Sequence, residues 1–270
     1  MNKKLINWWI GGASYSAAAQ TVFTNIGGTL SPSVKNAIAT FVDAEVAAGR
    51  WSNLDVFQLY GTALGSEAQG LKNWVSSSFA ATNPNGLTAS VNGYTFAASS
   101  SGILTNYNGT TGTNWTSTNA FMGAYVNSNG STTDQRLLIG NSASTAVWYQ
   151  RTVASRLDFI NSAGFNGLAT IQLAGYANGF TQGLYCEKQI GSGASTAAEL
   201  YKDGSLVATS STTSPVESNV SYYIGGQSGG GGAPWVGVLS AFVAGSGSGF
   251  SVPQFSSNFL TLITTLGVKI

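Results

Sequence analysis

The chain of 270 residues is long enough to bury a substantial core, and its length fits one large β domain with an appendage. Charged residues make up only 8% of it, against a usual value of about 25%. A net charge of +1 with scattered basic residues excludes nucleic acid as a partner, and 43% apolar residues exclude a disordered chain.

Two residue types are scarce enough to exclude whole classes of chemistry. The chain has no histidine, which removes Ser-His-Asp and Cys-His catalysis and histidine-ligated metals. Its single cysteine, Cys186, lies in a strand-like run and is predicted to be a buried, inert thiol. The absence of disulfides fits folding in a reducing cytoplasm.

Residues 1–30 are predicted to be an extended N-terminal docking segment. The run Leu5–Ile10 after Lys3-Lys4 resembles a signal peptide, but Gly11-Gly12 cuts it short, so we expect the segment to be kept. It contains Trp8 and Trp9, which either fold back onto the core or serve as an assembly anchor in a neighbouring subunit. No run approaches the roughly 20 apolar residues that span a membrane, so no membrane partner is expected.

Residues 31–82 are predicted to be a helical leader and linker. Ser31 and Pro32 are typical of a helix start, and Gly49 of a helix end. The apolar face of this helix is predicted from its three- and four-residue steps, and its acidic residues are expected on the solvated face. The predicted apolar positions are Val34, Ile38, Phe41, Val42 and Val46, and the predicted solvated ones are Asp43 and Glu45. Residues 50–60 are predicted to be a strand or extended link, and residues 67–75 a helical turn.

From residue 83 onward, short apolar runs alternate with turn signals, which is typical of an antiparallel all-β fold. Asn-Gly pairs fall between the runs, and Asp203-Gly204 predicts a tight hairpin. The segments after this hairpin, near residues 220–226 and 235–243, are predicted to complete a meander of four strands. The other predicted strands are Leu87–Val91, Tyr94–Phe96, Phe121–Val126, Arg136–Ile139, Ala146–Arg151, Arg156–Phe159 and Gly183–Lys188.

The chain is predicted to close with a helix over Pro253–Leu266, ended by Gly267. Val268-Lys269-Ile270 then either adds a short strand or tucks into the core. The fold class that follows is mainly β, an antiparallel jelly-roll sandwich over residues 83–270 preceded by a short helical N-terminal segment.

The C-terminal third resembles the concanavalin A-like (laminin G-like) lectin and glucanase sandwiches. The residues that carry the resemblance are Leu200-Tyr201-Lys202-Asp203-Gly204, Tyr223-Ile224-Gly225-Gly226 and Val236-Gly237-Val238-Leu239-Ser240-Ala241-Phe242. They match that superfamily's hairpin, Ile-Gly-Gly strand and closing strand. The resemblance implies a two-sheet sandwich and says little about function, because one sandwich hosts many tasks.

A narrower resemblance covers the N-terminal half. Residues 39–55, Leu71-Lys72-Asn73-Trp74 and the Gly93-Tyr94-Thr95-Phe96 strand are similar to tailed-bacteriophage virion proteins, which carry a short helical leader before such a sandwich. This implies a virion location and, as partners, other virion proteins and further copies of the chain.

The acidic residues lack the pattern of a hydrolase. Glucanases of this superfamily carry two or three acids on alternate residues of one strand, whereas the only pair here at that spacing, Asp43 and Glu45, falls on the predicted helix. The chain is therefore expected not to be an enzyme. No cofactor is expected either; calcium stays open because Asp134 or Asp158 could contribute a ligand.

Sugar binding would use aromatic ring faces. The candidates are Trp115, Trp148, Tyr149 and Trp235, each with the alternative of a core aromatic. We therefore expect a bacteriophage virion structural protein (a head or tail fibre, spike or decoration subunit) with possible cell-surface glycan contact. The alternatives are a carbohydrate-binding adhesion module of a bacterial surface or secreted protein and, third, a glycoside hydrolase.

Overall fold

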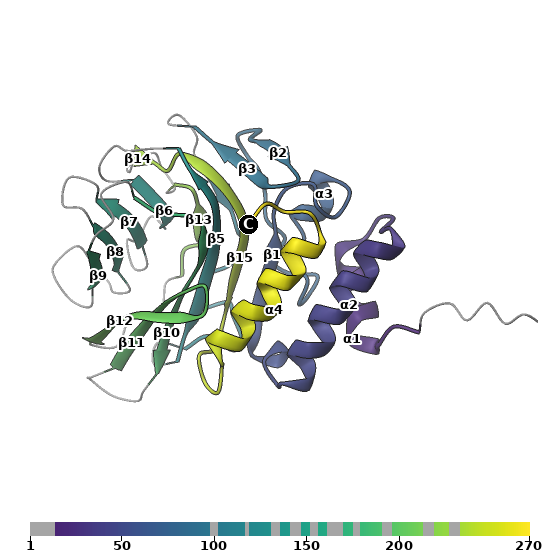
Figure 1. The fold of residues 1–270 in the computed structure, drawn as a ribbon, viewed down its shortest axis with the longest axis horizontal. Coiled ribbons are helices and arrows are strands. Elements are labelled where there is room, and N and C mark those ends of the chain that lie inside the picture. Colours follow the sequence, from purple (N-terminus) through teal and green to yellow (C-terminus); the bar gives the residue numbers. More distant parts are fainter. Residues whose placement is uncertain are drawn as a thin grey trace, which may run out of the picture.

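The computed structural model shows a mainly β protein of three layers, with two stacked sheets and a layer of helices (Figure 1). It describes residues 14–97, 102–116, 119–130, 136–140, 147–151, 156–160, 170–174, 179–190, 196–212, 219–226 and 233–270.

The middle layer is an eight-stranded antiparallel sheet centred on β15 (Gly237–Gly245). This strand pairs with β5 along one edge, and with β3 and then β1 along the other. The sheet order is β12 (Ser205–Thr212), β11 (Thr196–Lys202), β10 (Gly183–Ile190), β5 (Phe121–Asn129), β15, β3 (Gly93–Phe96) and β2 (Thr88–Ser90), with β1 (Leu54–Leu59) beside β15.

The outer layer is a seven-stranded sheet with the order β4 (Ile103–Leu104), β13 (Tyr223–Ile224), β6 (Arg136–Gly140), β7 (Val147–Arg151), β8 (Arg156–Ile160) and β9 (Thr170–Ala174). The short β14 (Ala233–Pro234) runs parallel to β6. All other pairs are antiparallel, so the expected antiparallel sandwich is confirmed.

The eight-stranded sheet is buried on both faces, because its strands carry apolar residues at successive positions rather than at alternate ones. In β5, Met122 and Ala124 pack between the two sheets, whereas Phe121 and Tyr125 pack under the helices. The helical layer consists of α1 (Ala17–Ile26), α2 (Pro32–Ala47) and α4 (Val252–Thr265); the short α3 (Glu67–Gly70) and the 3₁₀ turn η1 (Trp51–Asn53) lie in the connections between β1 and its neighbours in sequence.

The first helix corrects the prediction that residues 1–30 are irregular. Ser16 caps α1 by accepting a hydrogen bond from the Ala19 backbone N–H, and Val22 and Ile26 are buried in the core beneath the helices. The signals for it, Ser16 before a run of alanines and the four-residue spacing of Val22 and Ile26, are present in the sequence. Trp8 and Trp9 lie outside the described residues.

The second helix begins and ends where predicted, with Ser31 as its cap and Gly49 after it at a φ of 70°. The prediction of its buried face was wrong at two neighbouring positions. Glu45, expected in solvent, is fully buried, whereas Val46 is 45% exposed. Glu45 stands seven residues after Ile38 and four after Phe41, so helical geometry places it on the buried face.

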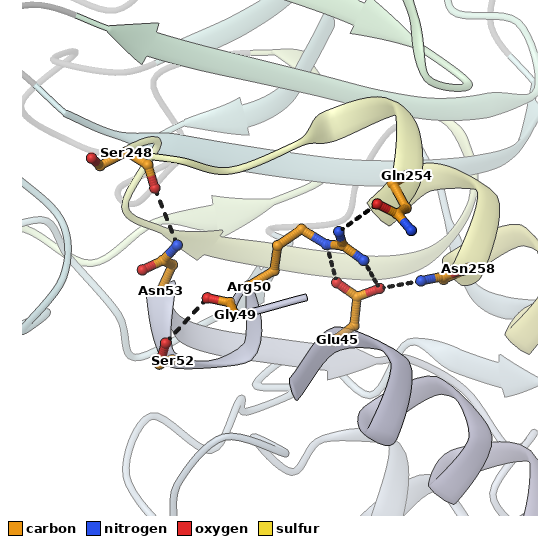
Figure 2. A network of polar contacts seen from close by, with 8 residues as sticks. All are labelled: Glu45, Gly49, Arg50, Ser52, Asn53, Ser248, Gln254 and Asn258. Atoms are coloured by element: carbon orange, nitrogen blue, oxygen red, sulfur yellow. Dashed lines mark hydrogen bonds and ion pairs between the residues drawn. The ribbon is translucent and has the colours of Figure 1, made fainter. Parts of the chain in front are cut away.

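Glu45 is accommodated there by partners from α4 and from the turn that follows α2 (Figure 2). Both of its carboxylate oxygens accept from the Arg50 guanidinium, at 2.6 and 2.9 Å, and Asn258 of α4 donates to Oε1 at 2.6 Å. Gln254 of α4 accepts a further bond from Arg50. Because the pair is fully hydrogen-bonded, burying it is tolerated, and it joins α2 to α4.

The predicted four-strand meander is only half correct. Asp203 and Gly204 have φ values of 50° and 82°, as a tight two-residue turn requires, and β11 pairs with β12 across it. The next two segments are strands, but β13 joins the seven-stranded sheet and β15 crosses to the centre of the other. Apolar content predicted the strands and not their partners. At the C-terminus, Val268 tucks into the core, the second of the two predicted outcomes.

Candidate functional site

Three of the four aromatic residues selected from the sequence lie in the core between the sheets. Trp115 is 5% exposed, and Trp148 and Trp235 are fully buried. Trp148 donates from its indole N–H to Glu187 at 3.0 Å, and Trp235 packs against Phe96. These indoles have no ring face open to a ligand, so the alternative of core aromatics applies to them.

Tyr149 occupies a different kind of position, which follows from strand register. It is paired with Asp158 of β8, and Asp158 is in turn paired with Gln172 of β9. The three residues therefore form a row across three adjacent strands, with neighbouring strands about 4.8 Å apart. The name "Tyr149 row" is used below for Tyr149, Asp158 and Gln172.

The face of the sheet on which this row lies is given by its neighbours. Trp148 and Leu157 are fully buried between the sheets. Successive residues of a strand belong to opposite faces, so positions 149 and 158 belong to the outer face. Ala174, two positions after Gln172, is exposed, which agrees with this assignment. Helices α1, α2 and α4 all lie on the far side of the eight-stranded sheet (Figure 1).

Two arginines share the same face. Arg151 and Arg156 are register partners, and each lies two positions along its strand from the Tyr149 row. The signal for this pair was present in the sequence, since both strands were predicted with a short connection between them. Pairing the strands would have brought the arginines opposite each other.

The chemistry of this outer face suits a polyhydroxylated ligand. A tyrosine ring offers an apolar face with a polar edge, a carboxylate accepts hydrogen bonds, and a primary amide both donates and accepts them. Sugar rings present an apolar face and hydroxyls that do both. The Tyr149 row places these three residue types at register positions on neighbouring strands.

Two further ionisable residues, Asp55 and Cys186, are buried within the fold. Asp55 is buried and accepts from the backbone N–H groups of Thr113, Asn114 and Trp115 and from the Tyr107 hydroxyl. It thereby fastens the loop before β5 to β1. Cys186 is buried, as predicted, and burial together with the charge of Asp203 raises the pKa of its thiol well above the usual range.

Within the described part of the chain, no three acidic or cysteine residues gather into a metal site. Of the two residues considered for calcium, Asp158 belongs to the Tyr149 row, and Asp134 lies outside the described residues. The helices that the structure describes include none long and apolar enough to cross a membrane.

A groove of about 390 Å³ lies between α2 and α4. Its floor is apolar, with Phe41 and Leu262, and its rim is polar, with Asn36 and Thr261 among its residues. Tyr15 donates from its hydroxyl to Asn36 at 2.9 Å, so residue 15, just before α1, lies beside this groove.

No protein-family model matches the sequence, and no curated protein matches it. The similarity is to solved structures. A single-site mutant of HCR/D superposes with a TM-score of 0.53 at 10% identity, over 78% of this chain and 53% of that one. A mutant of Trypanosoma rangeli sialidase displaying trans-sialidase activity superposes with a TM-score of 0.51 at 14% identity, over 84% of this chain and 39% of that one.

The chain thus spans about half the length of the first structure and about two fifths of the second. At these identities the similarity is one of fold alone. The protein is a mainly β antiparallel sandwich with N-terminal helices, and its fold is similar to that of the concanavalin A-like sandwiches, as the sequence resemblance predicted.

Proposed function

We propose that this chain is a non-enzymatic carbohydrate-binding sandwich whose ligand lies on the outer face of β7, β8 and β9. The observation that carries the proposal is the Tyr149 row, in which an aromatic, a carboxylate and an amide residue are register partners on one sheet face. The lectin-like fold supports it, although fold alone would not locate a site.

The dimensions of the row fit a short glycan. Three strands at a spacing of about 4.8 Å place the outer two positions roughly 10 Å apart, close to the length of two linked sugar rings. A sheet scaffold holds these positions with little freedom, which limits the entropy lost on binding.

A glycan array followed by calorimetry on any hit tests this proposal. Tyr149→Ala should weaken binding by roughly tenfold or more, since an aromatic anchor contributes about 1–2 kcal/mol. Asp158→Asn should weaken it while leaving the fold intact. Tyr201→Ala is the matched control, because Tyr201 is a half-buried strand tyrosine of the other sheet. Saturable binding that the Tyr149 variant retains in full would refute this location.

The absence of catalysis is part of the proposal. The lack of histidine and the absence of a paired-acid strand motif support it. Incubation with any polysaccharide that binds should release no reducing sugar. Release that scales with protein concentration and disappears on a single Asp or Glu substitution would refute this part.

A virion location is the second candidate function. We propose that the chain is a structural subunit of a tailed-bacteriophage particle, held to it through residues 1–13. Its support is the resemblance of the helical leader to such proteins and the position of Tyr15, which brings the start of α1 to the groove between α2 and α4.

Deletion of residues 1–13 tests the second candidate. The truncated chain should keep its thermal stability but lose co-purification with particles or self-association. The deletion must stop short of α1, because removing Val22 and Ile26 would empty part of the core. Trp8→Ala combined with Trp9→Ala should act as the whole deletion does. Unchanged assembly of both variants would argue against this anchor.

A further inference from the structure

The groove between α2 and α4 is apolar at its base and uncharged along its rim. Ala37, Phe41 and Leu262 form the base, and each is less than a tenth exposed. Thr40 and Thr261 on the rim are exposed. None of the described residues that line the groove is charged. A groove of this composition fits an apolar, uncharged occupant.

The rim of the groove offers mainly hydrogen-bond acceptors. The hydroxyl groups of Thr40, Thr261 and Thr265 donate to backbone carbonyls of their own helices at 2.8–2.9 Å. Each hydroxyl oxygen keeps lone pairs that can accept a further bond. The side-chain amide of Asn258 donates to Glu45. This rim therefore suits a group that donates a hydrogen bond, and the indole of tryptophan joins one N–H donor to a large apolar ring.

The described chain begins beside this groove. Tyr15 donates from its hydroxyl to Asn36 on the rim at 2.9 Å, and Gln20 donates to the backbone carbonyl of Tyr15 at 2.8 Å. The ring of Tyr15 also packs edge-on against Phe23, with the ring centroids 5.0 Å apart. These contacts hold residue 15 at the rim, so the preceding segment starts from that point.

The sequence before this point supplies a matching occupant. The run Leu5–Ile10 is uncharged and contains two neighbouring tryptophans. Gly11 and Gly12 follow it, and glycine readily adopts the φ values that reverse the direction of a chain. Residues 11–14 span up to about 14 Å when extended. The stretch of α2 along the groove, residues 33–44, is only about 16 Å long, so the run can reach the groove of its own chain.

We propose that residues 5–10 bind in the groove between α2 and α4 of the same chain, with an indole of Trp8 or Trp9 on the apolar base. The short tether gives this segment an effective concentration on the order of millimolar at its own groove, which favours it over the segment of a second copy. The inference goes beyond both proposed functions and concerns the free protein. It gives the anchor of the second candidate function a place to lie before assembly.

Disulfide trapping in the full-length chain tests the inference. Asn7→Cys keeps both indoles and is combined in turn with Thr40→Cys and Thr261→Cys, one on each side of the groove. Cys186 is buried, and burial raises the pKa of its thiol well above the usual range, so it should not compete. The matched control is Asn7→Cys with Thr21→Cys, an exposed threonine of α1 that also donates to its own helix. Both groove pairs should form a disulfide within one chain roughly tenfold faster than the control pair.

Replacing the two indoles separates binding from simple tethering. Trp8→Ala with Trp9→Ala, introduced into the Asn7→Cys and Thr40→Cys variant, should slow the trapping roughly tenfold, to the rate of the control pair. The inference is overturned by equal rates at the groove and control positions, or by a rate that this double replacement leaves unchanged.

Two further outcomes would also overturn it. Disulfides that join two chains would assign the groove to a second copy, and no disulfide at either groove position would leave the segment without a place there. Neither outcome touches the glycan assay or the assembly assay of the deletion variant, so a failure here is distinct from a failure of the proposed functions.

Discussion

Glu45 shows how a single buried charge joins elements that are distant in sequence. Its carboxylate receives hydrogen bonds from Arg50, five residues later, and from Asn258 on α4. Removing one partner of such a pair leaves an uncompensated charge, whereas removing both is often tolerated. The network therefore makes a clear prediction at the level of one residue.

Glu45→Ala should lower the free energy of unfolding by about 3–5 kcal/mol, because Arg50, only 2% exposed, would lose its charge partner. Asp43→Ala, two residues away and exposed, should change it by less than about 1 kcal/mol. Urea unfolding measures both. The double variant Glu45→Leu with Arg50→Met should recover much of the loss, and a double variant as unstable as Glu45→Ala would contradict this account.

Residue-level roles were the least predictable part of the chain. Composition alone does not say which aromatic residues lie in the core and which could face a ligand. Trp148 and Tyr149 are neighbours in sequence and fall on opposite faces of β7, so the strand register decides between them. Trp148 donates to Glu187 on β10 of the other sheet, which shows that Trp148 lies on the face between the sheets. That contact joins residues distant in sequence, so the local pattern could not reveal it.

At the level of elements, the β11–β12 hairpin illustrates how a turn is shaped by two constraints. Gly204 has a φ of 82°, which favours glycine, and a Cβ at this position would stand 3.1 Å from Pro253 Cα at the start of α4. The hairpin turn therefore packs on the N-terminus of the C-terminal helix.

Gly204→Ala should lower the free energy of unfolding by more than the roughly 1 kcal/mol that a left-handed alanine costs, since the contact with α4 adds to it. Gly249→Ala is the matched control, with a φ of 62° and no atom near the added Cβ. Chemical denaturation of both variants measures the difference. Equal losses would show that the turn conformation alone matters.

Elements were predicted better than their pairing. The strand segments after residue 87 follow from β-branched and aromatic content between Asn-Gly turns, and most were found. Strands β4 and β14 were missed because each is only two residues long, and β9 was missed although Asn-Gly pairs stand on both sides of it in the sequence. Strand partners depend on contacts between distant residues, as when β1 pairs with β15, and local pattern contains no information on these.

At the level of the whole molecule, the double burial of the eight-stranded sheet has a consequence for alkaline stability. Burial raises the pKa of several tyrosines, among them Tyr60, Tyr94 and Tyr125. At Tyr125, burial raises the pKa to about 12, and the charge of Asp203 is the second cause of this rise. The unfolded chain has the ordinary value of about 10.

As pH rises, the tyrosines of the unfolded chain lose their protons at a lower pH than those of the folded chain. The stability that protonated Tyr125 contributes is therefore complete below pH 10 and should fall between about pH 10 and 12. Urea unfolding at a series of pH values measures this slope. Tyr125→Phe should make it shallower, whereas Tyr15→Phe, at a half-buried position near the surface, serves as the comparison. A slope that Tyr125→Phe leaves unchanged would contradict the assignment.

The three-layer order also gives the molecule two unlike ends. Helices α1, α2 and α4 occupy one end, and strands β7, β8 and β9 occupy the other (Figure 1). Copies fixed by the helical end on a common support would all point the outer face of β7, β8 and β9, where we propose glycan binding, away from it. Weak contacts made by each copy would then add up to strong avidity, because every contact after the first is intramolecular. The proposed glycan binding would then not need to be tight in a single copy.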